Sequence, residues 1–522
     1  MDILPLRQHL ASAHAVFNGN HGDISHQARL RAVPRQTLYR QAYAVARALD
    51  GNQHRACLED LRQQLHQAHQ QLRDLQRQQR QWVALSPDRL AHFACTAQAE
   101  GVSLPVARRL LQVFLGDEAP SVARLGRCTR QVGQQAGALL QVLDEHSRPR
   151  VRQAAADEIF VGRRPVLMVV EQESLCWQNG QLAEHRDGDT WAKELGPLLA
   201  LEQLTRDGGT GLAKGLAQIN AQRRDTQRPT VADQADHFHL LREGTRALRR
   251  LQGQASRALE EAERAEATLL RCRRQGKKQT GVASIAGRQW RRAEAAMDRW
   301  SAQEQAWRRV REVLSLFTPA GQLNTRPRAE AVVAEVVPHL SGPEWSKVRR
   351  QLVRPEVFTF LDRVQEKLAA VPAEAGVREL LVQVEGRRRR PEAVQGEGPR
   401  PAALRGLLLV AAVVLSAGGE RAQQMLAGVR GVLAQAWRAS SLVEGLNSVL
   451  RMQQGRHRRL TQGLLDLKRL YWNSRTFRTG RRKGKTPYQL LRLSLPELNW
   501  WDLLKLSPEQ LRQQLSAPNK AA

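Results

Sequence analysis

Residues 157–170 decide the fold class of this chain, and they read DEIFVGRRPVLMVV. Residues 158–161 are predicted to form a short strand, and the Arg-Arg-Pro sequence at 163–165 is predicted to form a turn. Val166–Val170 is a continuous apolar run, which is typical of a strand buried on both faces. The stretch therefore predicts two strands that open a buried sheet.

The residues after this stretch alternate between strand and helix patterns. Ser174–Gln181 is expected to carry the sheet into a turn, and Thr230–Asp233 leads towards Asp236. Between them we expect helices at 190–199 and 210–224, and a strand at 201–206 that ends at Asp207-Gly208-Gly209. This alternation predicts an α/β core.

The charge balance points to a polyanionic partner. The chain has 522 residues, 81 Lys and Arg against 51 Asp and Glu, and a formal net charge of +30. A charge of this size repels itself in a compact protein and is tolerated when the partner is a polyanion. Nucleic acid is the first candidate and an anionic membrane the second. A hydrophobic content of 42% argues against wholesale disorder.

The membrane alternative is weak. The longest apolar run, Leu407–Leu415, is far shorter than the ~20 residues of a spanning helix, and we expect it to be a buried strand or helix core. The N-terminus lacks the pattern of a signal peptide. The five cysteines show no Cys-x-x-Cys spacing, which fits a reducing cytosol. We therefore expect a cytoplasmic protein with no membrane partner.

The N-terminal 50 residues predict short helices. Asp23 caps a helix through Ser25–Val33, and Pro34 opens a second helix that is rich in Arg, Gln, Thr and Tyr. Two short helices with a tight turn predict a helix-turn-helix, whose second helix enters the DNA major groove; the alternative is a plain helical bundle. The candidate DNA contacts are Arg35, Gln36, Thr37, Tyr39 and Arg40.

Two further helical segments follow. Apolar residues at alternating spacings of three and four predict a coiled-coil helix with a partner helix in the same chain or in a second subunit. The heptad positions are Leu58, Leu61, Leu65, Ala68, Leu72, Leu75, Gln79 and Trp82. Residues 86–145 predict a second helical DNA-binding bundle or a helical spacer.

The chain from about 240 to 440 is predicted to be helical, Arg-rich and almost without strands. Another helical stretch is expected from Ser440 to about Arg475, followed by a basic loop. The loop is either a solvated surface or a contact to DNA phosphates. Its candidate DNA-binding residues are Arg478, Arg481, Arg482, Lys483 and Lys485.

Three acidic residues stand out in this basic chain. Asp157 opens the first strand, Asp207 closes a later strand, and Glu444 lies near a helix start. Three carboxylates that converge from two strands and a helix can hold two divalent metal ions, and Mg²⁺ prefers such oxygen ligands. Each residue alone also has an ordinary explanation, as a turn former or as a charge at a helix start.

These residues resemble the DDE transposases of bacterial insertion sequences. Residues 157–170 resemble the family's opening hairpin with its first Asp, and 204–209 resemble its second Asp. Asp236 and His239 resemble the motif that follows in Mutator-like relatives, although Asp236 is a rival for the second Asp and His239 can be a core histidine. Glu444 with Asn447 resembles the final Glu and its helix, and 471–491 resemble the family's tail.

The resemblance implies a ribonuclease H-like core that is interrupted by a large all-α insertion between Asp207 and Glu444. It also implies that Asp157, Asp207 and Glu444 are catalytic and bind two Mg²⁺ ions, which Mn²⁺ can replace. The partners would be double-stranded DNA, as transposon ends and target, and further copies of the chain in a homodimer or higher oligomer. The protein would then lie at the bacterial nucleoid.

Together these patterns predict a multidomain, mostly α protein with an α/β core. The expected parts are a helix-turn-helix domain at 1–52, a coiled-coil helix at 53–84, a second helical DNA-binding domain at 85–150, a first core part at 151–240, an all-α insertion at 241–436, a second core part at 437–495 and a tail at 496–522. The expected function is Mg²⁺-dependent DNA cleavage and strand transfer. The alternatives are a DNA-binding protein without catalysis and a helical scaffold.

Overall fold

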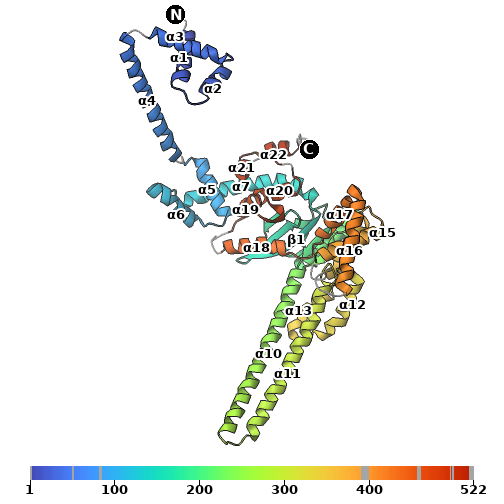
Figure 1. Ribbon diagram of the computed structural model, residues 1–522. Helices are drawn as coiled ribbons and strands as arrows, with labels where there is room; N and C mark the ends of the chain where they lie inside the picture. Colours follow the sequence, from blue (N-terminus) through green and yellow to red (C-terminus); the bar gives the residue numbers. More distant parts are fainter. Residues whose placement is uncertain are drawn as a thin grey trace. The chain divides into compact units, whose positions relative to one another are not determined.

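The structure is a computed structural model that describes residues 3–49, 52–81, 85–389, 399–454, 460–493, 495 and 499–516. The chain divides into two compact units, Met1–Pro87 and Asp88–Ala522. Most of the described residues are helical, and one small mixed sheet lies in the second unit (Figure 1). This confirms a mostly α protein that contains one strand-bearing segment.

The first unit consists of helices. They are α1 (Ile3–Phe17), α2 (Asp23–Leu30), α3 (Arg35–Ala48) and α4 (Asn52–Gln81). Leu38 and Ala42, one turn apart on α3, are fully buried against the other helices. Arg31, between α2 and α3, donates to Ser12 on α1 and to Gln41 on α3, at 2.7 and 3.0 Å. This polar contact ties the three short helices together.

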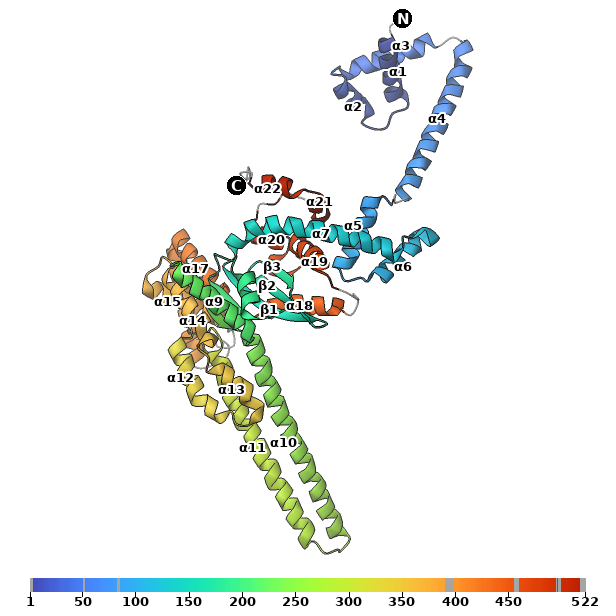
Figure 2. The same cartoon turned by 180° about the vertical axis from the view of Figure 1, so that it is seen from behind.

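The sheet has five strands in the order β3-β2-β1-β4-β5. The strands are β1 (Gln153–Val161), β2 (Arg164–Glu171), β3 (Trp177–Leu182), β4 (Gln203–Arg206) and β5 (Ala232–Ala235). β1 pairs antiparallel with β2, and β2 with β3, whereas β1, β4 and β5 run parallel. The first strand is therefore central, with a meander on one side and parallel crossovers on the other (Figure 2).

The sequence-based prediction was wrong at β3. Residues 178–181 read as a turn, yet they form most of this edge strand. Gln462 supplies the physical reason, because its amide accepts from Leu182 N at 2.9 Å and donates to Gly180 O at 3.0 Å. A side chain distant in the sequence thus satisfies backbone groups that the polar segment would otherwise leave to solvent.

The two faces of the sheet are covered by different helices. Alternation along β1 places Ala154 and Ala156 on one face and Ala155 and Ile159 on the other. The first face packs on α7 (Val122–Ser147), α8 (Gly188–Leu195), α9 (Thr210–Asp225) and α19 (Gln462–Ser474). The second face packs on α18 (Ser441–Gln454).

The helices that directly precede the sheet in sequence belong to the same compact unit as the sheet. They include α5 (Pro87–Ala99) and α6 (Leu104–Leu115) as well as α7, and Leu139 and Leu143 of α7 are fully buried in the core of the sheet. The segment expected at 85–150 as a domain of its own therefore lies, from Asp88 on, in one compact unit with the strands. Its predicted binding of DNA stays a prediction.

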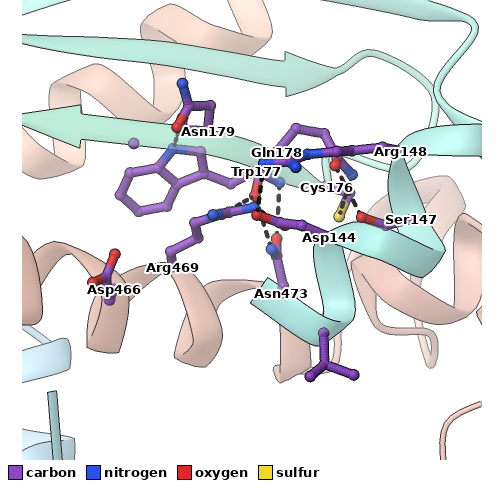
Figure 3. Close-up of polar contacts among 12 residues, drawn as sticks. Asp144, Ser147, Arg148, Cys176, Trp177, Gln178, Asn179, Asp466, Arg469 and Asn473 are labelled. Carbon is purple, nitrogen blue, oxygen red and sulfur yellow. Dashed lines mark hydrogen bonds and ion pairs between the residues drawn. The ribbon is translucent and has the colours of Figure 1, made fainter. Parts of the chain in front are cut away.

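A buried polar network joins α7, β3 and α19 (Figure 3). The guanidinium of Arg469 pairs with Asp144 and donates from Nε to Trp177 O at 2.8 Å. Asn473 accepts from Trp177 N at 2.8 Å and donates back to Trp177 O at 2.9 Å. Removing one partner of a buried charge pair is strongly destabilising because it leaves the other charge buried without a partner. The Arg469–Asp144 pair therefore holds α19 against α7 and the edge of the sheet.

The insertion between β5 and α18 is helical in its described residues. It begins with two long antiparallel helices, α10 (His237–Arg274) and α11 (Thr280–Val313), which run side by side (Figure 1). The helices that follow are α12 (Arg326–Val336), α13 (Ser346–Leu352), α14 (Thr359–Ala369), α15 (Ala375–Arg388), α16 (Pro399–Ala417) and α17 (Gly419–Ala434). The buried residues of the insertion form a core of their own.

The apolar run 407–415 does not form the buried element that we expected. It lies in α16, where Ala411 is buried but Leu409 and Val413 are 69% and 67% exposed. α16 packs on α15 and α17. Across the described residues, no helix is both long enough and apolar enough to cross a bilayer.

The last described residues form short helices that are packed by aromatic rings. They are α20 (Pro487–Leu490), α21 (Trp500–Leu504) and α22 (Pro508–Ser516). The Trp501 ring stacks on His92 of α5 with a centroid distance of 4.7 Å.

Candidate active site

Asp157 lies in the middle of the sheet. Its position on β1 puts the carboxylate on the face that α18 covers, together with Ala155 and Ile159. Asp157 is 7% exposed, and its Oδ1 accepts from Glu158 N at 2.8 Å. Burial raises the pKa of Asp157 to about 7, and the nearby charges of Glu444 and Asp207 raise it as well.

α18 contributes two polar residues to this place. Glu444 and Asn447 are three residues apart, so they share one face of the helix. Asn447 is fully buried and donates from Nδ2 to Asp157 Oδ2 at 2.7 Å. Its Oδ1 is buried without a hydrogen-bond partner in the described residues.

Asp207 lies directly after β4, which is the parallel neighbour of β1. Its Oδ1 accepts from Gly209 N at 2.9 Å in the turn that leads into α9. The structure thus brings Asp207 and Glu444 close enough to Asp157 to act on its ionisation.

Asp236 has a different environment, at the N-cap of α10. Its Oδ1 accepts from Phe238 N at 2.8 Å and from Ser440 N at 2.9 Å, and its Oδ2 accepts from Ser440 Oγ at 2.5 Å. Burial raises the pKa of Asp236, but the hydrogen bonds from His239 and Ser440 outweigh it and hold this pKa below its usual range. Asp236 therefore joins the start of α10 to the residue that precedes α18.

His239 bridges two carboxylates. Its Nδ1 contacts Asp236, and its Nε2 lies 3.2 Å from Glu444 Oε1. Hydrogen bonds to Asp236 and Glu444 raise the pKa of His239 to about 10, so the ring is an imidazolium at neutral pH. The same contact lowers the pKa of Glu444, whose other oxygen lies 3.4 Å from Arg451.

An open cleft of about 810 Å³ lies beside Asp157 and Asp207. Its floor includes the Gly209-Thr210-Gly211 start of α9. The carboxylates that line it outnumber the cationic side chains; they are Asp157, Glu158, Glu184, Asp187, Asp189 and Asp207 against Arg163, Arg186 and Lys214. The cleft is thus acidic in a strongly basic chain.

The donor set suits a hard divalent cation, because the three carboxylates offer only oxygen. The unpartnered Oδ1 of Asn447 adds a fourth oxygen beside them. In the part of the chain that the structure describes, however, no three His, Cys, Asp or Glu side chains are arranged to coordinate one ion. The side chain of Glu444 is directed instead to His239 and Arg451.

The basic loop after α19 lies close to the sheet at one residue. Arg482 donates to Glu173 O at 2.7 Å and to Gln172 O at 3.0 Å, which anchors the loop to the β2–β3 turn. Arg481 lies over the Trp437 ring at 5.2 Å. The remaining predicted DNA contacts of this loop are exposed; they are Arg478, Lys483 and Lys485.

The residues predicted to read DNA lie in the first unit, on α3. Arg35, Gln36, Tyr39 and Arg40 are exposed, and Thr37 is half-buried. Gln36 and Arg40 lie on the side of α3 away from the buried Leu38, whereas Arg35 lies one turn before Leu38 on the same side.

Several residues at the site were missed by the sequence analysis. Ser440 and Arg451 flank Glu444 on and before α18, and Arg186 and Lys214 line the cleft. Only the proximity of Ser440 to Glu444 along the chain could have indicated one of them, since the others depend on the fold.

No known protein-family profile matches the chain, and a search of curated proteins finds no match.

Proposed function

We propose that this chain is a DNA transposase of the DDE type, which binds the terminal inverted repeats of a mobile element and catalyses strand cleavage and strand transfer. The observation that carries the proposal is the meeting of three carboxylates from separate elements, Asp157, Asp207 and Glu444, in which two raise the pKa of the third. A buried carboxylate whose pKa is raised by burial and by neighbouring carboxylates is typical of functional sites.

The sheet supports the proposal. A central first strand with an antiparallel meander on one side and parallel strands on the other is the order expected of a ribonuclease H-like core. In such a core the first Asp belongs on β1, the second at the end of β4 and the Glu on the helix after an insertion, as here. The helical segment 237–434 takes the place of the expected insertion.

Asp157, Asp207 and Glu444 would hold Mg²⁺ through their oxygens, with Asn447 beside them. Bound there, two ions would activate the attacking hydroxyl and stabilise the leaving oxygen. Other parts of the protein would bind the DNA. The basic loop at 478–485 and the exposed face of α3 would bind DNA phosphates and base edges.

His239 and Asp236 would act as positioning residues. The imidazolium holds Glu444, and Asp236 holds both the ring and Ser440 at the start of the Glu444 helix. This arrangement restricts where the Glu444 carboxylate can lie. Because Asp236 is engaged by Ser440 and His239, Asp207 remains our candidate for the second catalytic Asp.

The test is Mg²⁺-dependent cleavage and joining of DNA that carries the sequences flanking the gene. We expect Asp157→Asn and Glu444→Gln to abolish both reactions while DNA affinity in EDTA stays within about threefold. The matched control is Asp225→Asn, an exposed carboxylate at the far end of α9, which should leave both reactions intact. Full activity of both site variants would show that the site is assigned wrongly.

The alternative is a DNA-binding protein without catalysis. One observation favours it: Glu444 is engaged by His239 and Arg451, and no coordinating arrangement of three side chains exists among the described residues. This alternative predicts tight DNA binding by the unmodified chain with no cleavage in either Mg²⁺ or Mn²⁺.

A further inference from the structure

The far end of the α10–α11 hairpin carries a concentrated positive charge. Residues 267–292, called the hairpin tip below, contain eight basic residues and no acidic residue. The tip comprises the last turns of α10, the connection 275–279 and the first turns of α11 (Figure 1). Its basic residues are Arg271, Arg273, Arg274, Lys277, Lys278, Arg288, Arg291 and Arg292, and all are exposed.

The stem of the hairpin beside the tip has the opposite character. Four acidic residues precede the tip on α10, namely Glu260, Glu261, Glu263 and Glu266. Ion pairs neutralise arginines here and nearer the base, as in Arg264–Glu260 at 3.2 Å and Arg309–Glu335. A polyanion is therefore not attracted by the part of the stem beside the tip and is attracted at the tip. A separate basic stretch nearer the base holds Arg242, Arg246, Arg249 and Arg250.

Ordinary structural roles explain only part of this charge. Arg271, Arg273 and Arg274 occupy the last turn of α10, where they favour the helix dipole. Arg288 and Arg291 lie inside α11, beyond the reach of either helix end. Within the described residues, Arg292 is the one basic residue of the tip that forms an ion pair, with Glu261 at 3.1 Å.

We infer that the hairpin tip binds the phosphate backbone of duplex DNA. The eight residues of α10 in the tip rise about 12 Å, and duplex DNA carries one negative charge per ~1.7 Å of axis, so several phosphates lie within reach of the tip at once. Arg and Lys on both helices and the turn can contact them without reading sequence. The choice of DNA as the polyanion rests on the proposed function.

An anionic membrane is the other surface that such a tip could meet. Membrane-bound helices bury an apolar face in the bilayer. The exposed large apolar side chains of the tip are Leu270 and Ile285, one on each helix, which is too little for such a face. The charge without an apolar face favours DNA.

The experiment measures DNA affinity of the full chain across salt concentrations in EDTA, so that it does not depend on cleavage. The tip variant is Arg271→Gln/Arg274→Gln/Lys277→Gln/Lys278→Gln. The matched control is Arg308→Gln/Arg311→Gln/Arg328→Gln/Lys347→Gln, which removes the same charge from exposed positions at the base of the hairpin and in the helices after it. A 40-base-pair duplex of arbitrary sequence is the probe.

We expect the tip variant to lower the slope of log affinity against log salt by about 2 to 4, since each phosphate contact contributes about 0.9. The control should lower it by less than about 1. Equal slopes for the two variants would overturn the inference, and so would tip-dependent binding to vesicles of phosphatidylserine and phosphatidylcholine in place of DNA. If the tip contributes to binding but the chain cleaves no DNA, the proposed function fails and the inference stands.

Discussion

At the scale of single residues, His239 shows how one side chain connects the insertion to the candidate site. Its two ring nitrogens contact Asp236 and Glu444, which are more than 200 positions apart in the sequence. The Asp-x-x-His pattern was visible in the sequence, as was the order of Asp157, Asp207 and Glu444. The contact to Glu444 was not, because it depends on the return of the chain after the insertion.

We expect His239→Gln to lower strand cleavage by about 10- to 100-fold, which is the usual cost of losing a residue that orients a metal ligand. DNA affinity in EDTA should stay unchanged. The measurement is the cleavage rate against Mg²⁺ concentration, because a positioning role shifts the concentration needed for half-maximal rate. His185→Gln, in the wall of the cleft, is the control. A rate loss with unaltered Mg²⁺ dependence would contradict the positioning role.

Lys468 makes a pH-dependent contribution to stability. The ammonium is buried and donates to Gln98 O at 2.6 Å, and burial lowers the pKa of Lys468 to about 7. Between this value and the ordinary value of 10.5 the unfolded chain holds a proton that the folded chain lacks. The free energy of unfolding therefore rises with pH through this window.

Lys468→Met should remove that rise. We expect the difference in free energy of unfolding, native minus variant, to increase between pH 7 and pH 10, as measured by urea denaturation at each pH. Parallel curves for the two proteins would contradict the lowered pKa.

At the scale of elements, local sequence patterns predicted some helices and strands, whereas elements that depend on contacts distant in the sequence were missed. β1, β2 and α9 were predicted because their apolar runs and helical spacing are local signals. β3 was missed because its backbone is completed by Gln462 of α19. The pairing of Arg469 with Asp144 joins two helices that no local pattern relates.

The close crossing of α7 and α19, two helices distant in the sequence, gives a testable prediction. A Cβ added at Gly133 of α7 would lie 2.5 Å from Gly463 O of α19, which forces the helices apart. Gly133→Ala should therefore lower the free energy of unfolding by about 1 to 3 kcal/mol, although alanine is the better helix former. Denaturant unfolding measures it.

The matched control comes from the other side of the same crossing. A Cβ at Gly463 would meet its nearest neighbour in Gly133 at 3.4 Å, an ordinary van der Waals contact. Gly463→Ala should be close to neutral. Equal losses for both variants would show that helix propensity or local strain, and not the crossing, controls the effect.

At the scale of the whole molecule, self-association is expected through α4. The side chains of Leu61, Leu65 and Leu72 are 56%, 41% and 55% exposed in the first unit, on the stripe that the heptad pattern predicted. Of the remaining heptad positions, Ala68 is exposed, Trp82 lies outside the described residues, and the side chains of Leu58, Leu75 and Gln79 are not described. Leucines at this spacing bury their surface when a second helix packs on them.

We expect Leu65→Glu/Leu72→Glu to shift the full chain to monomer in sedimentation velocity at micromolar concentration. The control Gln63→Glu/Gln70→Glu adds the same charge on the opposite side of α4 and should leave the assembly intact. An unmodified chain that is already monomeric would contradict self-association through α4.

The hydrogen bond between Ser440 N and Asp236 Oδ1, 2.9 Å long, has a consequence for the history of the gene. The two ends of the insertion therefore lie side by side, and the segment between them buries its apolar residues in a separate core. Segments with adjacent ends and their own core are the ones that chains gain and lose as a whole. Relatives of this protein can therefore differ by some two hundred residues in length while keeping the strands and α18 in place, so residues 151–240 and 437–493 are the parts to align when relatives are sought.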